Sequence, residues 1–231
     1  MNYLQLVNRT RIECGVSGAN TPLTTVVGLT GESSRIASWV NSAWTDIQTA
    51  KEDWQWMREP LQFNTVTQQQ IYTPTEVGVA ATFANWKRDS FRCSSVGQSF
   101  KDEQLMNYME YNTFRNLYQY ANMRTTYARP VVVSITPPDK DLGFGSIPDQ
   151  PYVISGEYYV KPVEFVADTD TPAIGFQDRF HMAIVYRAMM YYAGFEAASE
   201  VYQRGELEFK RLMNRIDIDQ LPTLISGPPL A

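Results

Sequence analysis

The stretch Asp178–Ile216, DRFHMAIVYRAMMYYAGFEAASEVYQRGELEFKRLMNRI, decides how the rest of the chain is organised. Its apolar and small residues recur at steps of three and four, the period of a helix with one buried stripe. The stripe consists of Phe180, Ile184, Ala188, Tyr191, Phe195, Ala198, Tyr202, Gly205, Phe209, Leu212 and Ile216. An unbroken helix would span about 60 Å, and Gly194 and Gly205 would each weaken it by about 1 kcal/mol. We therefore expect a helical hairpin that turns near 193–198, in preference to one long or kinked helix.

The composition is that of an ordered globular protein. Hydrophobic residues make up 44% of the 231 residues and charged residues 19%, which is enough for a packed core in one large or two small domains. The net charge of −5 argues against a free-standing nucleic-acid binder. No run approaches 18 apolar residues, so we expect no membrane partner. The first residues lack the basic and apolar regions of a secretory signal.

Cysteine and histidine are too few and too scattered for a typical metal site. Cys14 and Cys93 lie far apart in the sequence, and we expect buried free thiols, with a disulfide or a reactive thiol as the alternative. The single histidine, His181, follows the stripe residue Phe180 and is expected to be a structural residue near a helix start. No metal and no cofactor are predicted.

Two helices are predicted near the start of the chain. The first covers 2–14 and ends at Gly15, and a loop rich in Gly, Thr and Ser follows. Ser33 or Ser34 is placed to cap the second helix, whose apolar face runs through 36–50.

Trp44, Trp54 and Trp56 lie on the second helix and just after it. The helical spacing favours burial in the core. The functional alternative is an aromatic platform on which a sugar or a nucleotide stacks.

The middle of the chain alternates in the manner of β-strands. We predict a β-hairpin over 63–74 and one or two strands around a turn over 83–93. The mixed charge of Lys87-Arg88-Asp89 favours a solvated turn. The alternative is a loop tip that contacts phosphate or lines a DNA channel. Its basic residues would be Lys87, Arg88 and Arg92.

The second half of the chain is predicted to hold a third helix and further strands. The helix covers 102–122, where the apolar stripe is looser. Short strands are expected at 131–135, 152–154 and 157–160, each ended by Pro or Gly. Gly143-Phe144-Gly145 is a lone G-x-G that we assign to a Pro-rich turn.

These elements predict an α+β fold, a helical bundle built from N- and C-terminal helices with inserted antiparallel β segments. We expect one domain over 1–216, with β material at about 60–100 and 125–172. Prolines prevent a helix over 217–231, and this apolar segment either folds back on its own domain or forms an extended arm that docks on another chain. The arm residues expected to make contacts are Leu221, Pro222, Leu224, Ile225, Pro228 and Leu230.

No catalytic pattern is present in the sequence. It has no G-x-x-x-x-G-K-[ST], G-x-G-x-x-G or G-x-S-x-G motif. Its scattered carboxylates are expected on solvated helix faces or at helix caps, and we predict that the protein is not an enzyme. The carboxylates considered are Asp46, Glu52, Asp53, Glu103 and Glu110.

The order of these parts resembles the head-to-tail adaptor (connector) proteins of tailed bacteriophages. The resemblance is carried by the N-terminal helix with its Thr/Ser-rich loop and by the segment from Ile36 that ends in Asp53-Trp54-Gln55-Trp56-Met57-Arg58. It is also carried by Phe63…Tyr72-Thr73-Pro74, followed by Trp86-Lys87-Arg88-Asp89-Ser90-Phe91. The last part is Phe180-His181-Met182-Ala183-Ile184-Val185-Tyr186-Arg187-Ala188-Met189 with Tyr191-Tyr192-Ala193.

The resemblance implies a structural virion protein in the phage neck, made in the cytoplasm of the bacterial host. It implies a ring, of twelve copies in this family, that binds the portal protein, seats a tail or nozzle protein and passes DNA of any sequence. In some members a C-terminal arm reaches the portal, and 217–231 is the matching segment. The alternatives are another neck or tail ring component, such as a terminator, and a carbohydrate-binding or peptidoglycan-acting module.

Overall fold

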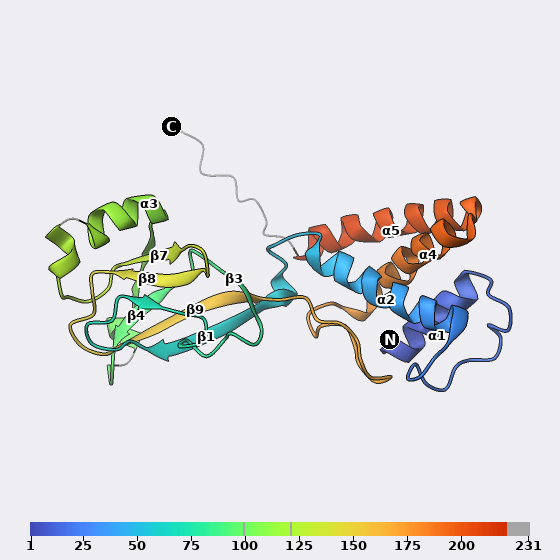
Figure 1. Ribbon diagram of the computed structural model, residues 1–231, viewed down its shortest axis with the longest axis horizontal. Coiled ribbons are helices and arrows are strands. Elements are labelled where there is room, and N and C mark those ends of the chain that lie inside the picture. Colours follow the sequence, from blue (N-terminus) through green and yellow to red (C-terminus); the bar gives the residue numbers. More distant parts are fainter. Residues whose placement is uncertain (99, 121, 221–231) are drawn as a thin grey trace. The chain divides into compact units, whose positions relative to one another are not determined.

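The computed structural model describes residues 1–98, 100–120 and 122–220. The chain divides into two compact units (Figure 1). The helical unit takes Met1–Met57 and the chain from Pro162 onward, and the β unit takes Arg58–Lys161. The α+β prediction is therefore confirmed, with the β strands inserted between helices from the two ends of the chain.

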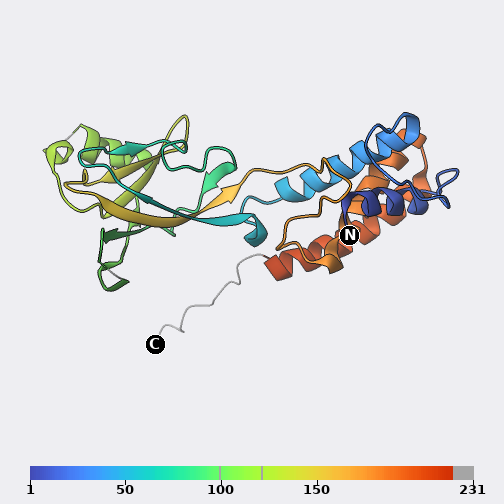
Figure 2. The same ribbon diagram turned by 90° about the horizontal axis from the view of Figure 1, so that it is seen from below.

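Four α-helices form the described part of the helical unit. They are α1 (Tyr3–Glu13), α2 (Gly31–Thr49), α4 (Met182–Glu196) and α5 (Ser199–Gln220), and a 3₁₀ turn, η5 (Asp178–Phe180), precedes α4. In Figures 1 and 2, helices α1 and α2 lie beside α4 and α5, and the contacts α1–α2, α1–α4, α2–α4 and α4–α5 join them into one bundle. The expected bundle of N- and C-terminal helices is thus observed.

The hairpin predicted for 178–216 is also observed. Helix α4 ends at Glu196, and its C-cap residue Ala197 has a left-handed backbone with φ 53°. Gly205 is not a breaker, because a Cβ there would lie 3.0 Å from the carbonyl oxygen of Tyr186, so the glycine lets α5 approach α4. Helix α5 continues to Gln220, which makes the first four residues of the predicted arm helical.

Both predicted N-terminal helices are observed, but the residue that was expected to cap the second one is wrong. Asn2 and Gln5 form a capping box on α1, and Gly15, with φ 68°, follows its end. Helix α2 begins at Gly31 after Thr30, so Ser33 and Ser34 lie inside its first turn and do not cap it.

Tryptophans 44 and 54 are buried in the helical unit, as the core interpretation predicted. Trp44 is 2% exposed and stacks on Phe165, with ring centroids 5.9 Å apart. Trp54 is fully buried, donates its Nε1 hydrogen to Ile47 and stacks on Trp56. An exposed aromatic platform at these positions is therefore excluded.

Two sheets form the β unit (Figure 2). The first has the order β1-β9-β4-β5, with β3 also paired to β9, and the second has the order β2-β8-β7-β6. The first sheet contains β1 (Arg58–Asn64), β3 (Phe83–Trp86), β4 (Arg92–Ser95), β5 (Gln104–Leu105) and β9 (Tyr152–Val160). The second sheet contains β2 (Ile71–Tyr72), β6 (Asn107–Tyr108), β7 (Val132–Thr136) and β8 (Asp141–Gly145).

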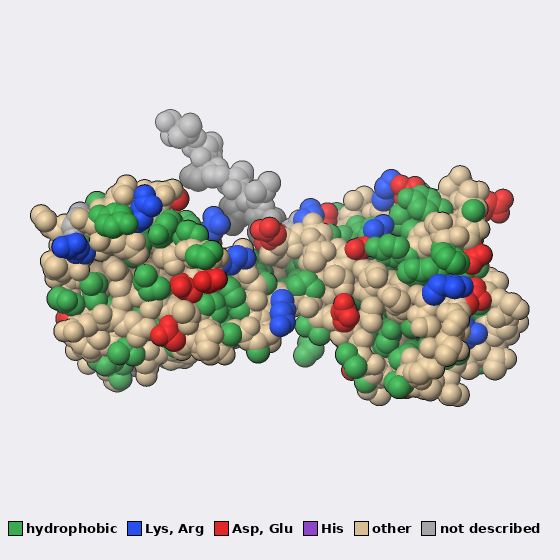
Figure 3. All heavy atoms as spheres, in the orientation of Figure 1, with side chains coloured by type: hydrophobic (Ala, Val, Ile, Leu, Met, Phe, Trp, Pro, Cys, Tyr) green, Lys and Arg blue, Asp and Glu red, His purple; other side chains and the backbone are tan. Residues whose placement is uncertain are grey.

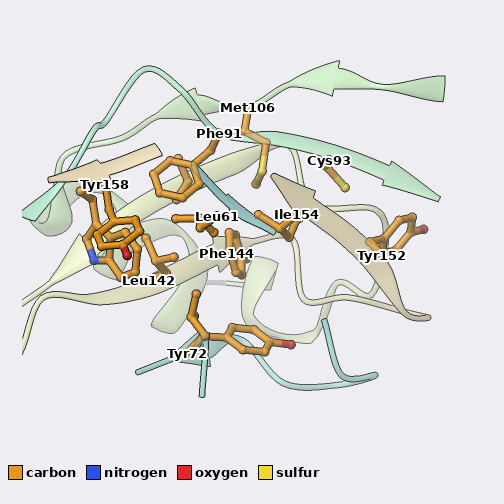
Figure 4. Packing of buried hydrophobic residues seen from close by; sticks show 13 residues of the cluster. Leu61, Tyr72, Phe91, Cys93, Met106, Leu142, Phe144, Tyr152, Ile154 and Tyr158 are labelled. Atoms are coloured by element: carbon orange, nitrogen blue, oxygen red, sulfur yellow. The ribbon is translucent and has the colours of Figure 1, made fainter. Parts of the chain in front are cut away.

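One hydrophobic core joins the two sheets (Figure 4). Leu61 and Ile154 come from the first sheet and Leu142 and Phe144 from the second, and all four are buried. Because both sheets bury side chains in this cluster, each depends on the other for its packed face.

Strand pairing in the β unit differs from the prediction. There is no hairpin over 63–74, because β1 pairs with β9 and β2 pairs with β8. The strands predicted at 152–154 and 157–160 are one strand, β9. Strand β8 was assigned to a turn because of Gly143 and Gly145.

Those two glycines belong to a strand because aromatic rings lie directly on them. A Cβ at Gly143 would lie 2.9 Å from the ring of Phe114, and one at Gly145 would lie 2.7 Å from the ring of Tyr118. These rings come from the region where a helix over 102–122 was predicted. The prediction of that helix is wrong, because the region contains β5, β6, a single helical turn α3 (Tyr111–Phe114) and a π-helical turn η3 (Arg115–Gln119).

Both cysteines are free and buried, as expected, and burial raises the pKa of Cys14 to about 12, with Glu13 and Glu32 adding to the shift. Among the helices in the described ranges, none is long and apolar enough to cross a membrane.

Candidate functional site

The predicted basic loop tip is a short turn held between two buried aromatic residues. Trp86 and Phe91 are 2% and 0% exposed, and the Nε1 hydrogen of Trp86 is donated to the carbonyl of Lys140 at 2.5 Å. Between them, Ser90 Oγ donates to the carbonyl of Lys87 at 2.7 Å and accepts the Glu157 amide hydrogen at 2.9 Å. These bonds attach the backbone of the turn to β9.

A surface hollow of about 700 Å³ lies beside the turn, across strands β1, β9 and β4. We call it the sheet hollow. Its floor includes Gly156, where a Cβ would lie 2.8 Å from the Phe91 ring, so this position needs glycine. The charged side chains that line it are Arg58, Lys87, Asp89, Arg92 and Glu157.

Each cation of the sheet hollow has an acidic partner. Lys87 Nζ lies 2.6 Å from Asp89, Arg58 lies 3.8 Å from Glu157, and Arg92 lies 3.5 Å from Glu103. The hydrogen bond from Lys87 lowers the pKa of Asp89. The lining cations of the sheet hollow are therefore compensated by carboxylates among the described residues.

The structure brings together two of the three predicted cations. Lys87 and Arg92 line the hollow, whereas the Arg88 guanidinium lies over the Tyr108 ring, 5.2 Å from its centroid. Arg58 was missed by the sequence analysis. Arg58 is the first residue of β1 and reaches the hollow through the pairing of β1 with β9, for which the sequence holds no local signal.

The contact residues predicted for the C-terminal arm lie outside the described residues. They are Leu221, Pro222, Leu224, Ile225, Pro228 and Leu230.

The carboxylates considered as catalytic candidates have structural partners or open surroundings. Asp46 accepts hydrogen bonds from Arg187 Nε at 2.7 Å and Tyr191 Oη at 2.6 Å, which joins α2 to α4. Burial raises the pKa of Tyr191, and its hydrogen bond to Asp46 adds to this shift. Glu110 caps α3 by accepting the amide hydrogen of Asn112.

The remaining candidates are likewise accounted for. Glu103 pairs with Arg92, and Glu52 and Asp53 are exposed. Over 1–98, 100–120 and 122–220, no group of three or more His, Cys, Asp or Glu is arranged to hold a metal ion.

Asp102 and Arg129 form an ion pair at the end of β4. Asp102 accepts the Ser95 amide hydrogen at 2.9 Å and pairs with Arg129 Nη1 at 2.7 Å, while Arg129 Nη2 also donates to the carbonyl of Cys93. Hydrogen bonds from Ser95, followed by those from Arg129, lower the pKa of Asp102 to about 2.

His181 is buried at the start of α4, where the sequence placed a structural histidine. Its ring Nε2 lies 3.2 Å from the carbonyl oxygen of Phe176, and the rings of the two residues stack. Burial lowers the pKa of His181, and the positive amino terminus adds to the shift.

Charge is mixed on the visible face of each unit, where Figure 3 shows basic and acidic side chains interspersed. Such a surface favours weak contacts with a polyanion over tight binding.

Comparison with protein families shows a match over nearly the whole chain. The sequence model described as SU10 adaptor protein matches residues 1–226, which covers both units. No curated protein matches the chain.

Proposed function

Because this chain belongs to the SU10 adaptor protein family, a family of phage head-to-tail adaptors, we propose that it is a structural virion protein that forms a ring between portal and tail. The family is one of structural adaptors and not of enzymes. The observation that carries the proposal is the match over 1–226, which takes in the helices from both ends of the chain and the inserted β unit.

In this proposal twelve copies extend the DNA channel below the portal, at the neck of the virion, and seat a tail or nozzle protein. The mixed surface charge and the ion-paired cations of the sheet hollow support passage of DNA without strong binding. Lys87, Arg92 and Arg58 are the residues that would meet passing phosphates, and Arg88, held on Tyr108, would contribute less.

The C-terminal segment 217–231 is proposed to bind the portal. Its first four residues, Asp217–Gln220, form the last turn of the bundle helix α5. The residues after Gln220 are apolar and contain three prolines, which suits an extended strand that docks in a groove of another protein.

The test is assembly of the protein on its portal ring, imaged by negative-stain electron microscopy. The full chain should add a ring to the portal, and a chain cut after Gln220 should keep its helical content and lose this binding. A control variant keeps the length but carries Leu221→Ser, Leu224→Ser and Ile225→Ser, and it should also fail to bind.

Two results would overturn these proposals. Normal assembly of the cut chain would exclude the arm. A full chain that binds the tail tube but never the portal would show another neck component, such as a terminator.

A further inference from the structure

The β unit contains a long segment without acidic residues. No Asp or Glu occurs over 111–138, whereas Arg115, Arg124 and Arg129 all lie there. This is unusual in a chain whose net charge is −5. Arg129 forms an ion pair with Asp102. Neither Arg115 nor Arg124 forms an ion pair with any residue that the structure describes.

The same segment exposes large apolar side chains. From η3 to the start of β7, the exposed fraction is 43% for Leu117, 71% for Tyr120, 39% for Met123, 51% for Tyr127 and 45% for Val131. We call these five residues, with Arg115 and Arg124, the docking segment. Figure 3 shows hydrophobic and basic side chains on the surface over α3 and the turns that follow it.

The docking segment is anchored to the β unit. Phe114 is fully buried and Tyr118 is 8% exposed, and their rings lie on the glycines of β8. The Arg115 guanidinium lies 5.9 Å from the Tyr111 ring centroid and 5.8 Å from that of Tyr120. The exposed side chains of the docking segment are thus carried by a backbone that is anchored to the β unit, which lowers the entropic cost of binding.

The chemistry of the segment favours a protein partner over nucleic acid. Tyr, Met and Arg are enriched in protein–protein interfaces, and Tyr and Arg are frequent hot spots. Two unpaired arginines are few for a phosphate-binding surface, because each neutralised phosphate adds to affinity. Leu117 and Met123 have no polar group with which to bind a nucleic-acid backbone.

An acidic counterpart is present in the helical unit. The β unit carries ten Lys or Arg and ten Asp or Glu, so the entire net charge of −5 belongs to the helical unit. At the turn between α4 and α5, Phe195 is 57% exposed, and the Arg35 guanidinium lies 4.5 Å from its ring centroid. The exposed residues Glu196 and Glu200 follow Phe195 in the sequence. No ion pair holds either glutamate within the described part of the chain.

We propose that the docking segment of one copy binds the α4–α5 turn of a second copy. Two arginines with exposed aromatic and aliphatic groups would meet two glutamates with an exposed phenylalanine. Because two different surfaces meet, the contact is heterologous and can close into a ring. This inference rests on the proposed ring and names the surfaces that build it.

The first test reverses the charges. Arg115→Glu with Arg124→Glu should weaken ring assembly on the portal about 100-fold, since like charges would then face each other and each factor of ten corresponds to about 1.4 kcal/mol. Glu196→Arg with Glu200→Arg should weaken it similarly, and the chain carrying all four changes should recover assembly. The readout is the number of copies per portal ring by native mass spectrometry across a concentration series.

A control variant separates the docking segment from general surface effects. Val66 is 56% exposed on the same unit but outside the segment, so Val66→Ser should assemble normally while Tyr120→Ser should not. Far-UV circular dichroism should show all variants folded.

Cross-linking gives a second, independent readout. The native thiols Cys14 and Cys93 are buried, so a chain with Tyr120→Cys and Phe195→Cys should react with a bis-maleimide mainly at the new positions. On the portal it should give a ladder of dimers, trimers and higher multimers, and either single variant should give no ladder.

The outcomes distinguish this inference from the proposed function. If rings form normally with Arg115→Glu and Arg124→Glu, the inference is wrong and the adaptor function stands. If those changes reduce DNA retention in the virion while assembly is unchanged, the segment contacts DNA and the inference is again wrong. If the unaltered chain forms no ring on the portal, both fail.

Discussion

The helical unit and the β unit differ in how their contacts relate to the sequence. In the helical unit, α4 packs on α5 next to it in the chain, and the bundle closes by joining α1 and α2 to this hairpin. In the β unit, β9 pairs with β1, β3 and β4, all of which precede it by more than 50 residues. Helical periodicity is therefore a strong guide to one unit, while alternation in the other shows that strands exist but not which ones pair.

The largest expected effect comes from truncating a core aromatic in either unit. Trp44→Ala in the helical unit and Phe91→Ala in the β unit should each cost about 3–5 kcal/mol, because both side chains are buried among aromatic rings. Hydrogen exchange by mass spectrometry should show lost protection mainly in the altered unit. Equal loss in both units after either change would contradict the division into two units.

A smaller effect is expected from removing the β unit. Replacing Arg58–Lys161 by about six flexible residues should change the free energy of unfolding of the bundle by about 1 kcal/mol or less, because the paired first and last strands of the β unit already hold its two ends together. Urea unfolding followed by circular dichroism measures this. The excised β unit should also fold, because its first and last strands pair with each other, and a disordered NMR spectrum of that fragment would argue against it.

Two glycines should respond to alanine with opposite signs. Gly156→Ala should cost about 1–3 kcal/mol, because its Cβ would lie 2.8 Å from the Phe91 ring. Gly194→Ala in α4 meets no atom within 4 Å and should stabilise the helical unit by about 0.5–1 kcal/mol. Thermal melts of the two variants give the test, and stabilisation by Gly156→Ala would show that the core of the β unit is loosely packed.

The smallest expected effect is a difference between the two units in how their stability depends on pH. Burial lowers the pKa of His181 below 6.5, so the unfolded chain takes up a proton more readily and the helical unit should lose stability as the pH falls below about 6.5. The pKa of Asp102 is about 2 against 3.8, so its contribution to the β unit holds above about pH 4 and is lost between 3.8 and 2.

Amide hydrogen exchange at pH 7, 5 and 3, read by mass spectrometry, would measure the stability of each unit. His181→Gln should remove the loss between pH 7 and 5, and Asp102→Asn should weaken the β unit at pH 7 and flatten its change below pH 4. Equal pH dependence in the variants and the unaltered chain would show that other groups control acid stability.

Sequence patterns predicted the helical unit closely because its signals are local. The three- and four-residue steps of 178–216 gave both helices of the hairpin, and Trp44 and Trp54 were placed in the core. The β unit was predicted less well because its decisive contacts are remote. Gly143 and Gly145 resemble a turn until the rings of Phe114 and Tyr118 are known to lie on them.

The candidate site shows the same contrast. Lys87 and Arg92 could be named from a charged turn beside strand-like residues. Arg58 joins them only because β1 lies beside β9. The docking segment had a signal in the sequence, the absence of Asp and Glu over 111–138, but its exposed aromatic residues resembled one face of a helix.

The insertion of the β unit also sets an order of events during synthesis. Helices α1 and α2 leave the ribosome first, yet their partners α4 and α5 follow only after the 104 residues of Arg58–Lys161. At about 5–20 residues per second, that interval is roughly 5–20 s. The β unit, closed by its own first and last strands, can fold in this time, while the apolar faces of α1 and α2 remain uncovered. The nascent chain is therefore most exposed to chaperones and to aggregation through its first two helices.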